Sequence, residues 1–96
     1  MLEKDFQKKL IEKLEQQYPG AIIYKNDTKQ GFQDLTILWG KHWALLECKK
    51  DKDASHRPNQ DYWVERANKM SFSSFIYPEN EGDVLNALEQ AFRSDR

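Results

Sequence analysis

The segment GFQDLTILWGKHWALLECKK, residues 31–50, contains two apolar runs joined by a turn, and the other predicted elements are placed around it. Residues 35–39 and 43–48 are the two runs, with β-branched and aromatic side chains, and the dipeptide Gly40-Lys41 between them supplies a turn-forming glycine. This pattern predicts a β-hairpin. Asp34 opens its first strand, and an E-x-K tripeptide, residues 47–49, closes its second.

Side chains alternate between the two faces of a strand, so the charged and apolar residues of this hairpin should separate. Cys48 and the apolar residues two and four positions before it are expected under a helix, with Glu47 and Lys49 on the other face and Asp34 across the hairpin. Two carboxylates can hold a hard divalent cation such as Mg²⁺, and a lysine can orient water or stabilise phosphate charge. The alternative is an exposed ion pair at a strand end, which contributes little energetically. The pattern alone does not decide between them.

The segments Gly31-Phe32-Gln33-Asp34 and Glu47-Cys48-Lys49, followed by Gln60, resemble the motifs of the PD-(D/E)xK nuclease superfamily. Within it the chain resembles the small VRR-NUC domains, which are often single-domain phage proteins, and the resemblance covers nearly all of the chain. The family pattern is G-x-P-D, then E-x-K, then a glutamine that opens a helix with a nearby aromatic residue. Gln33 stands where the family usually has proline, a departure that affects the local turn and leaves Asp34 in place.

The resemblance implies a catalytic site made of Asp34, Glu47, Lys49 and Gln60. Asp34 and Glu47 would bind one or two Mg²⁺ or Mn²⁺ ions together with the backbone carbonyl of Cys48. Lys49 would position or help deprotonate the attacking water, and Gln60 would support it. The implied protein is a metal-dependent DNA endonuclease that acts on branched DNA such as Holliday junctions or flaps, and works as a homodimer.

Length and composition predict a single domain over residues 1–96. No hydrophobic run approaches the roughly 20 residues that span a bilayer, and the start MLEKDFQKK is charged, unlike a signal sequence. We therefore expect a soluble cytoplasmic protein, in the host cytoplasm if it is a phage protein. The one cysteine, Cys48, is expected in the core, and the sequence has no Cys/His cluster for zinc.

The formal net charge of −1 argues against a polycationic DNA-binding protein but allows a local basic surface. Basic side chains follow the E-x-K tripeptide, and another lies in the polar loop before the hairpin. The candidates for contact with nucleic-acid phosphates are Lys50, Lys52, His56 and Arg57, with Lys29 from that loop. The alternatives are a solvated loop, whose field Asp51 and Asp53 weaken, and a plain connection.

Apolar residues at helical spacing predict a first helix over residues 2–17, which Pro19-Gly20 ends. At about 100° per residue, Glu3 falls on the apolar stripe and Glu12 on the opposite side. Glu3 either favours the helix dipole at the first turn or leans over the sheet as a further metal ligand. The resemblance favours the second and prefers Glu3 to Glu12.

The remaining elements are predicted from turn residues and periodicity. They are a strand at 21–25, a linker at 51–57, a helix at 59–69 with Pro58 in its first turn, a strand at 71–77, a turn at 78–82 and a closing helix marked by apolar residues at 84–92. Tyr62 and Trp63 are expected in the core, with base stacking as the alternative. The order predicts an α/β domain with a restriction-endonuclease-like αβββαβ core, a mixed sheet flanked by helices, and a parallel pair of strands around the 59–69 helix.

Three other functions remain open at this stage. The first is a nuclease that acts on RNA or on linear DNA ends. The second is a catalytically inactive nucleic-acid-binding or protein-interaction module of the same fold, against which the intact Asp34, Glu47 and Lys49 argue. The third is an interaction protein built on Tyr62, Trp63 and the closing helix.

Overall fold

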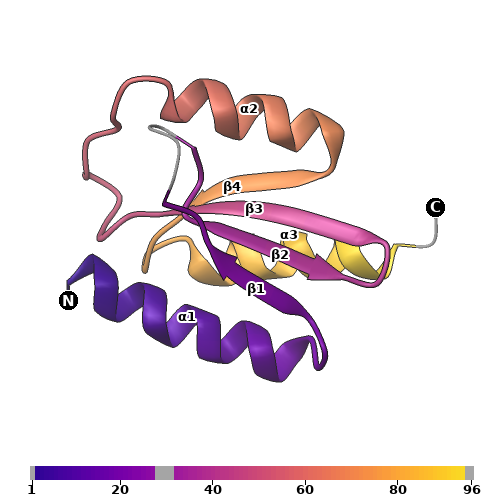
Figure 1. Cartoon of the computed structure of the whole chain (residues 1–96). Coiled ribbons are helices and arrows are strands. Elements are labelled where there is room, and N and C mark those ends of the chain that lie inside the picture. The colour runs from indigo at the N-terminus through magenta and orange to yellow at the C-terminus, as the bar shows by residue number, and fades with distance from the viewer. Residues whose placement is uncertain (1, 28–31, 95–96) are drawn as a thin grey trace.

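A computed structural model of the chain describes residues 2–27 and 32–94. Its elements are α1 (Glu3–Gln17), β1 (Ile22–Lys25), β2 (Leu35–Trp39), β3 (His42–Cys48), α2 (Gln60–Met70), β4 (Phe72–Ile76) and α3 (Glu81–Arg93) (Figure 1). The strands form one mixed sheet in the order β1-β2-β3-β4, in which β4 pairs with β3 in parallel and the other pairs are antiparallel. The predicted α/β class, the αβββαβ order with a C-terminal helix and the parallel pair are thereby confirmed. No helix in the described ranges is long and apolar enough to cross a membrane.

The β2–β3 hairpin follows directly from its sequence. Trp39 pairs with His42, so Gly40 and Lys41 form the connecting loop, and Gly40 has a φ of 61°, a conformation that glycine adopts without steric cost. The register also pairs Leu35 with Leu46. β2 has the predicted bounds, and β3 begins one residue before the predicted start.

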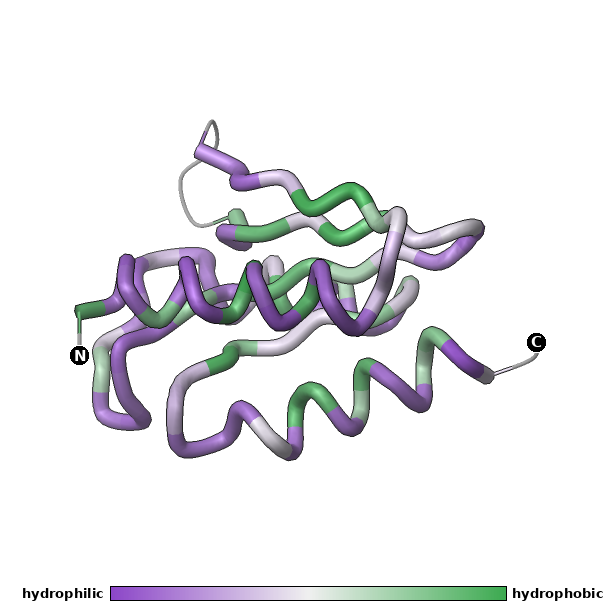
Figure 2. The backbone as a smooth tube through the Cα atoms, turned by 90° about the horizontal axis from the view of Figure 1, so that it is seen from below, coloured by the Kyte–Doolittle hydropathy of each residue, from purple (hydrophilic) through white to green (hydrophobic). Residues whose placement is uncertain are grey.

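One face of the sheet packs against α1 and α3 and carries the hydrophobic core. Figure 2 shows both helices on the same side of the sheet. The core consists of Phe6, Leu10, Leu14, Tyr18, Leu35, Ile37, Ala44, Leu46, Cys48, Ile76, Val84, Leu88 and Phe92. Burial of the residues at positions 44, 46 and 48 confirms the expected apolar face of β3, and Cys48 is the core residue that the sequence predicted.

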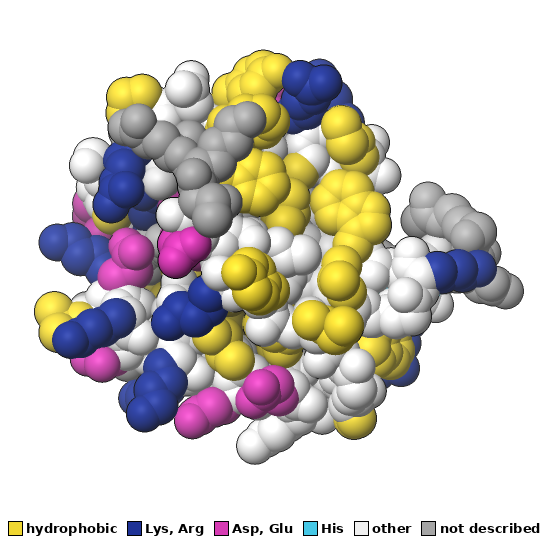
Figure 3. All heavy atoms as spheres, viewed as in Figure 1, with side chains coloured by type: hydrophobic (Ala, Val, Ile, Leu, Met, Phe, Trp, Pro, Cys, Tyr) yellow, Lys and Arg dark blue, Asp and Glu magenta, His cyan; other side chains and the backbone are white. Residues whose placement is uncertain are grey.

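The opposite face is covered only in part. α2 packs against β4 and β3, while on the β1–β2 half Ile22 and Tyr24 are each 61% exposed and Leu38 is 42% exposed. Ile22 pairs with Leu38, so these two side chains share this face. Figure 3 shows hydrophobic side chains gathered over this side of the molecule. The sheet thus has one fully covered face and one half-open face.

The boundaries of α2 and α3 differ from the predicted ones. Pro58 lies in a turn before α2 rather than in its first turn, because Asn59 has a φ of 73° and a left-handed residue cannot continue the helix backwards. α3 begins at Glu81, so Gly82 lies inside the helix and the preceding turn is shorter than predicted.

Substitutions on the two faces of the hairpin should differ in how much they lower the free energy of unfolding. Leu46→Ala should lower the free energy of unfolding by about 2–5 kcal/mol, because it leaves a cavity in the core. Leu38→Ala, on the half-open face of the neighbouring strand, should change it by only about 0.5 kcal/mol. Urea denaturation of both variants measures the difference, and equal losses would contradict this packing.

Candidate active site

Asp34 and Glu47 lie next to each other at one end of the hairpin. Leu35 and Leu46 are a register pair that points into the core, so the adjoining residues Asp34 and Glu47 face each other on the opposite side of the sheet. Oδ2 of Asp34 accepts a hydrogen bond of 2.8 Å from the backbone N–H of Cys48, which fixes the aspartate against β3. Glu47 is only 3% exposed. The predicted pair of carboxylates is thus brought together by strand pairing.

The amide of Gln60, at the start of α2, connects the lysine to the glutamate. Its Oε1 accepts a hydrogen bond of 2.7 Å from Nζ of Lys49, and its Nε2 donates one of 2.9 Å to Oε2 of Glu47. Nζ of Lys49 also donates to the carbonyl of Ser55 at 3.1 Å. Lys49 and Gln60 are buried like Glu47. The alternative of an exposed Glu/Lys pair at a strand end is therefore wrong.

The electrostatics of Glu47 favour a neutralising partner. Burial, followed by the negative charge of Asp34, raises its pKa to about 8. Its Oε1 is buried and has no hydrogen-bond partner among the described residues. A buried carboxylate oxygen without a donor, beside a second carboxylate, can be satisfied by a proton or by a cation. The two carboxylates therefore fit the oxygen-donor set that Mg²⁺ and Mn²⁺ prefer.

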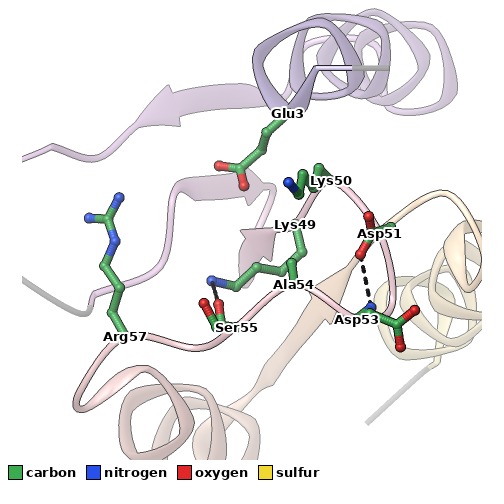
Figure 4. Close-up of a pocket in the computed structure, with 8 residues that line it drawn as sticks. All are labelled: Glu3, Lys49, Lys50, Asp51, Asp53, Ala54, Ser55 and Arg57. Carbon is green, nitrogen blue, oxygen red and sulfur yellow. Dashed lines mark hydrogen bonds between the residues drawn. The ribbon is translucent and has the colours of Figure 1, made fainter.

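A hollow beside these residues opens between α1 and the 51–57 loop. Figure 4 shows Glu3 extending from α1 into the hollow and Arg57 entering it from the facing loop. Burial, followed by the charge of Asp34, raises the pKa of Glu3, against the opposing effect of Lys49 and nearby cations. The carboxylate of Glu3 is thus close enough for the charges of Asp34 and Lys49 to shift its pKa. Glu3 was expected on the core face, but it is exposed.

The predicted metal ligands are brought together only in part. Within residues 2–27 and 32–94, no three Asp, Glu, His or Cys side chains are grouped closely enough to hold a metal ion. Glu3 as a further ligand and the carbonyl of Cys48 as another both stay predictions. Glu12 lines a different part of the α1 surface, in agreement with the preference for Glu3.

The basic residues divide between two sides of the 51–57 loop. Lys50 and Arg57 line the hollow that contains Glu3 and Lys49. Lys52 and His56 line a separate groove along α2 and β4. In that groove the ring of His56 stacks on Phe75, with 4.1 Å between centroids, and its Nδ1 lies 2.8 Å from Oδ1 of Asp61. Lys29 lies outside the described residues.

Neither aromatic residue of α2 lies in the hydrophobic core, so the core prediction is wrong for both. Tyr62 is 52% exposed, and Trp63 is half-buried with its ring packed edge-on against Phe32. The buried residues of α2 are Gln60 and Ala67, which define a narrow inner stripe. Tyr62 falls outside this stripe.

Two residues of the site environment escaped the sequence analysis. Ser55 contributes its backbone carbonyl to Lys49, a contact that residue type does not reveal. Gln33 is completely buried beside Asp34 and hydrogen-bonded to α2 and β4. Its only signal in the sequence was the departure from the G-x-P-D pattern.

Comparison of the chain with protein-family models, curated proteins and solved structures finds no match. The resemblance to PD-(D/E)xK nucleases therefore stays a prediction.

Because Glu47 is buried, the fold should lose stability as pH rises from 4.5 to about 8 in the presence of chelator. Its folded-state pKa of about 8 lies above the ordinary value of 4.5, so the folded chain holds a proton that the unfolded chain releases. The stabilisation from this proton is complete below the unfolded pKa and is lost as pH rises through the folded pKa.

Urea denaturation at a series of pH values between these two pKa values measures this effect. Glu47→Gln keeps the size and an acceptor for Gln60 but cannot ionise, so its stability should fall less with pH than that of the native chain. Parallel stability curves for the two proteins would show that Glu47 is not the titrating group.

Proposed function

We propose that the chain is a metal-dependent endonuclease that hydrolyses phosphodiester bonds in DNA. The observation that carries this proposal is the hydrogen-bonded set in which Gln60 bridges Lys49 and Glu47, with Asp34 beside them. Burying several ionisable groups together is costly for a fold. Such groups are typical of sites that must shift pKa values and manage charge during a reaction.

Asp34 and Glu47 would hold the metal ion through their carboxylate oxygens. When bound, Mg²⁺ or Mn²⁺ supplies Lewis-acid chemistry, making water more nucleophilic and offsetting negative charge on the phosphate. The hydrogen bond from the N–H of Cys48 keeps Asp34 in one orientation, and the unpartnered Oε1 of Glu47 is the atom that gains most from a cation.

Lys49 would act on the attacking water or on the phosphate, from the side of the hollow. Two acceptors, Oε1 of Gln60 and the carbonyl of Ser55, hold its Nζ. Held this way, the amine is positioned to orient the attacking water or to stabilise charge that develops on the phosphate. Arg57 and Lys50 line the same hollow, where they would bind the phosphates that flank the scissile bond.

The family resemblance further implies that the substrate is branched DNA, such as a Holliday junction or a flap. It also implies that the chain works as a homodimer, and both points are part of the proposal. One small chain with a net charge of −1 offers little surface to a duplex. A pair of copies would present two hollows, and hence two sites, to two strands.

Cleavage of a panel of labelled DNA molecules tests the proposed activity. The substrates are linear duplex, single strand, flap and four-way junction, each with Mg²⁺, with Mn²⁺ and with chelator. Cutting that requires metal and is lost in Asp34→Asn would support the nuclease, and the panel would name the preferred structure. Absence of cutting on every substrate would favour a non-catalytic module.

Lys49 should be essential for turnover rather than for folding. Lys49→Met keeps the aliphatic stem but removes the charge, so the cleavage rate should fall by about 100-fold or more. Lys41→Met, at the exposed tip of the hairpin, is the matched control and should keep the native rate. Full activity of Lys49→Met, measured under single-turnover conditions, would remove the lysine from the mechanism.

A further inference from the structure

Gln33 is a completely buried polar residue next to a candidate metal ligand. It is 0% exposed, whereas glutamine is rarely fully buried in proteins. Its Nε2 donates hydrogen bonds of 2.8 Å to the carbonyl of Trp63 on α2 and of 2.9 Å to Oγ of Ser73 on β4. One side chain therefore connects the segment that leads into β2 with two elements that follow much later in the chain.

The same short segment is held from the other side by Asn26. Its backbone N–H donates to the carbonyl of Asp34 at 2.7 Å, and its Nδ2 donates to the carbonyl of Gln33 at 3.1 Å. The backbone at 33–34 thus lies between Asn26 after β1 and the α2–β4 unit. Gln33 joins the residue next to Asp34 to α2, whereas Glu47 contacts α2 directly through Gln60.

The amide of Gln33 is not an efficient way to stabilise the core. Its Oε1 is buried and accepts no hydrogen bond from the described residues, which is costly for any buried acceptor. A methionine would occupy a similar volume without the unsatisfied Oε1, but it would also remove the two donated hydrogen bonds. The amide is therefore better explained by the two directed hydrogen bonds that it donates than by core stability.

We propose that Gln33 is a positioning residue that sets the carboxylate of Asp34 against Glu47 by holding its segment to α2 and β4. α2 then acts as a common frame for both carboxylates, through Gln60 for Glu47 and through Gln33 for Asp34. The proposal rests on the proposed function in one respect, because the cation is what the two carboxylates are positioned to bind.

The variant Gln33→Met tests this role, with Gln90→Met on the exposed side of α3 as the matched control. Gln33→Met should melt close to the native temperature, because removal of the unsatisfied Oε1 offsets the two lost hydrogen bonds. It should bind Mn²⁺ about tenfold or more weakly, as expected when a partner that orients a ligand is removed. Isothermal titration with Mn²⁺ alone, without DNA, measures the affinity. Gln90→Met should match the native chain in both measurements. Ser73→Ala removes one of the two hydrogen bonds and should weaken Mn²⁺ binding to a smaller degree.

A second measurement separates this inference from the proposed function. The amide N–H of Cys48 donates to Asp34, so its hydrogen exchange, followed by NMR in chelator, reports the position of Asp34 without metal. Gln33→Met should speed exchange at Cys48 but not at Leu46 in the same strand. If the native chain binds no Mn²⁺, the proposed function fails, and faster exchange confined to Cys48 still supports the inference. Native exchange at Cys48, or equal acceleration at both amides with a lower melting temperature, would overturn it.

Discussion

The bridge that Gln60 makes between Lys49 and Glu47 is the interaction on which the rest of the site depends. An ammonium and a carboxylate are buried here at the end of β3, and burial is tolerable only when their polar atoms have partners. Gln60 supplies one acceptor and one donor, and its Oε1 also accepts from the backbone N–H of Arg57. The helix start, the 51–57 loop and the strand end are thereby fixed as one unit. Oε1 of Glu47 has no hydrogen-bond partner among the described residues, and this is the atom at which the proposed cation would bind.

The mixed sheet brings these groups together because one of its faces carries the hydrophobic core and the other carries the charged residues. α1 and α3 cover one face with a continuous core, so the charged residues that alternate with that core must lie on the other face. α2 covers the half of that face formed by β3 and β4, and its first turn lies over the carboxylates. Glu3, the first residue of α1, extends into the hollow that Lys49 also lines. The site is thus formed where two helices and a strand end meet, a common position for binding and catalysis.

Local patterns predicted the parts of this structure that local physics determines. The hairpin, its glycine turn and the parallel pairing of β4 follow from alternation, from φ at Gly40 and from the helix that connects two strands. Strand alternation predicted that Glu47 and Lys49 share a face, whereas the position of Gln60 beside them was expected only from the family resemblance. Burial of Gln33, exposure of Tyr62 and the separation of Lys52 and His56 from the hollow depend on packing between distant segments, which periodicity does not encode.

Asp34 and Glu47 are proposed to bind a divalent cation between them. Anomalous scattering from crystals of the native chain grown with Mn²⁺ would locate the metal. We expect one strong peak in contact with a carboxylate oxygen of each residue, including Oε1 of Glu47, and no peak there in crystals of Asp34→Asn. A native structure with Mn²⁺ bound elsewhere, or with Oε1 of Glu47 satisfied by a protein donor, would contradict this proposal.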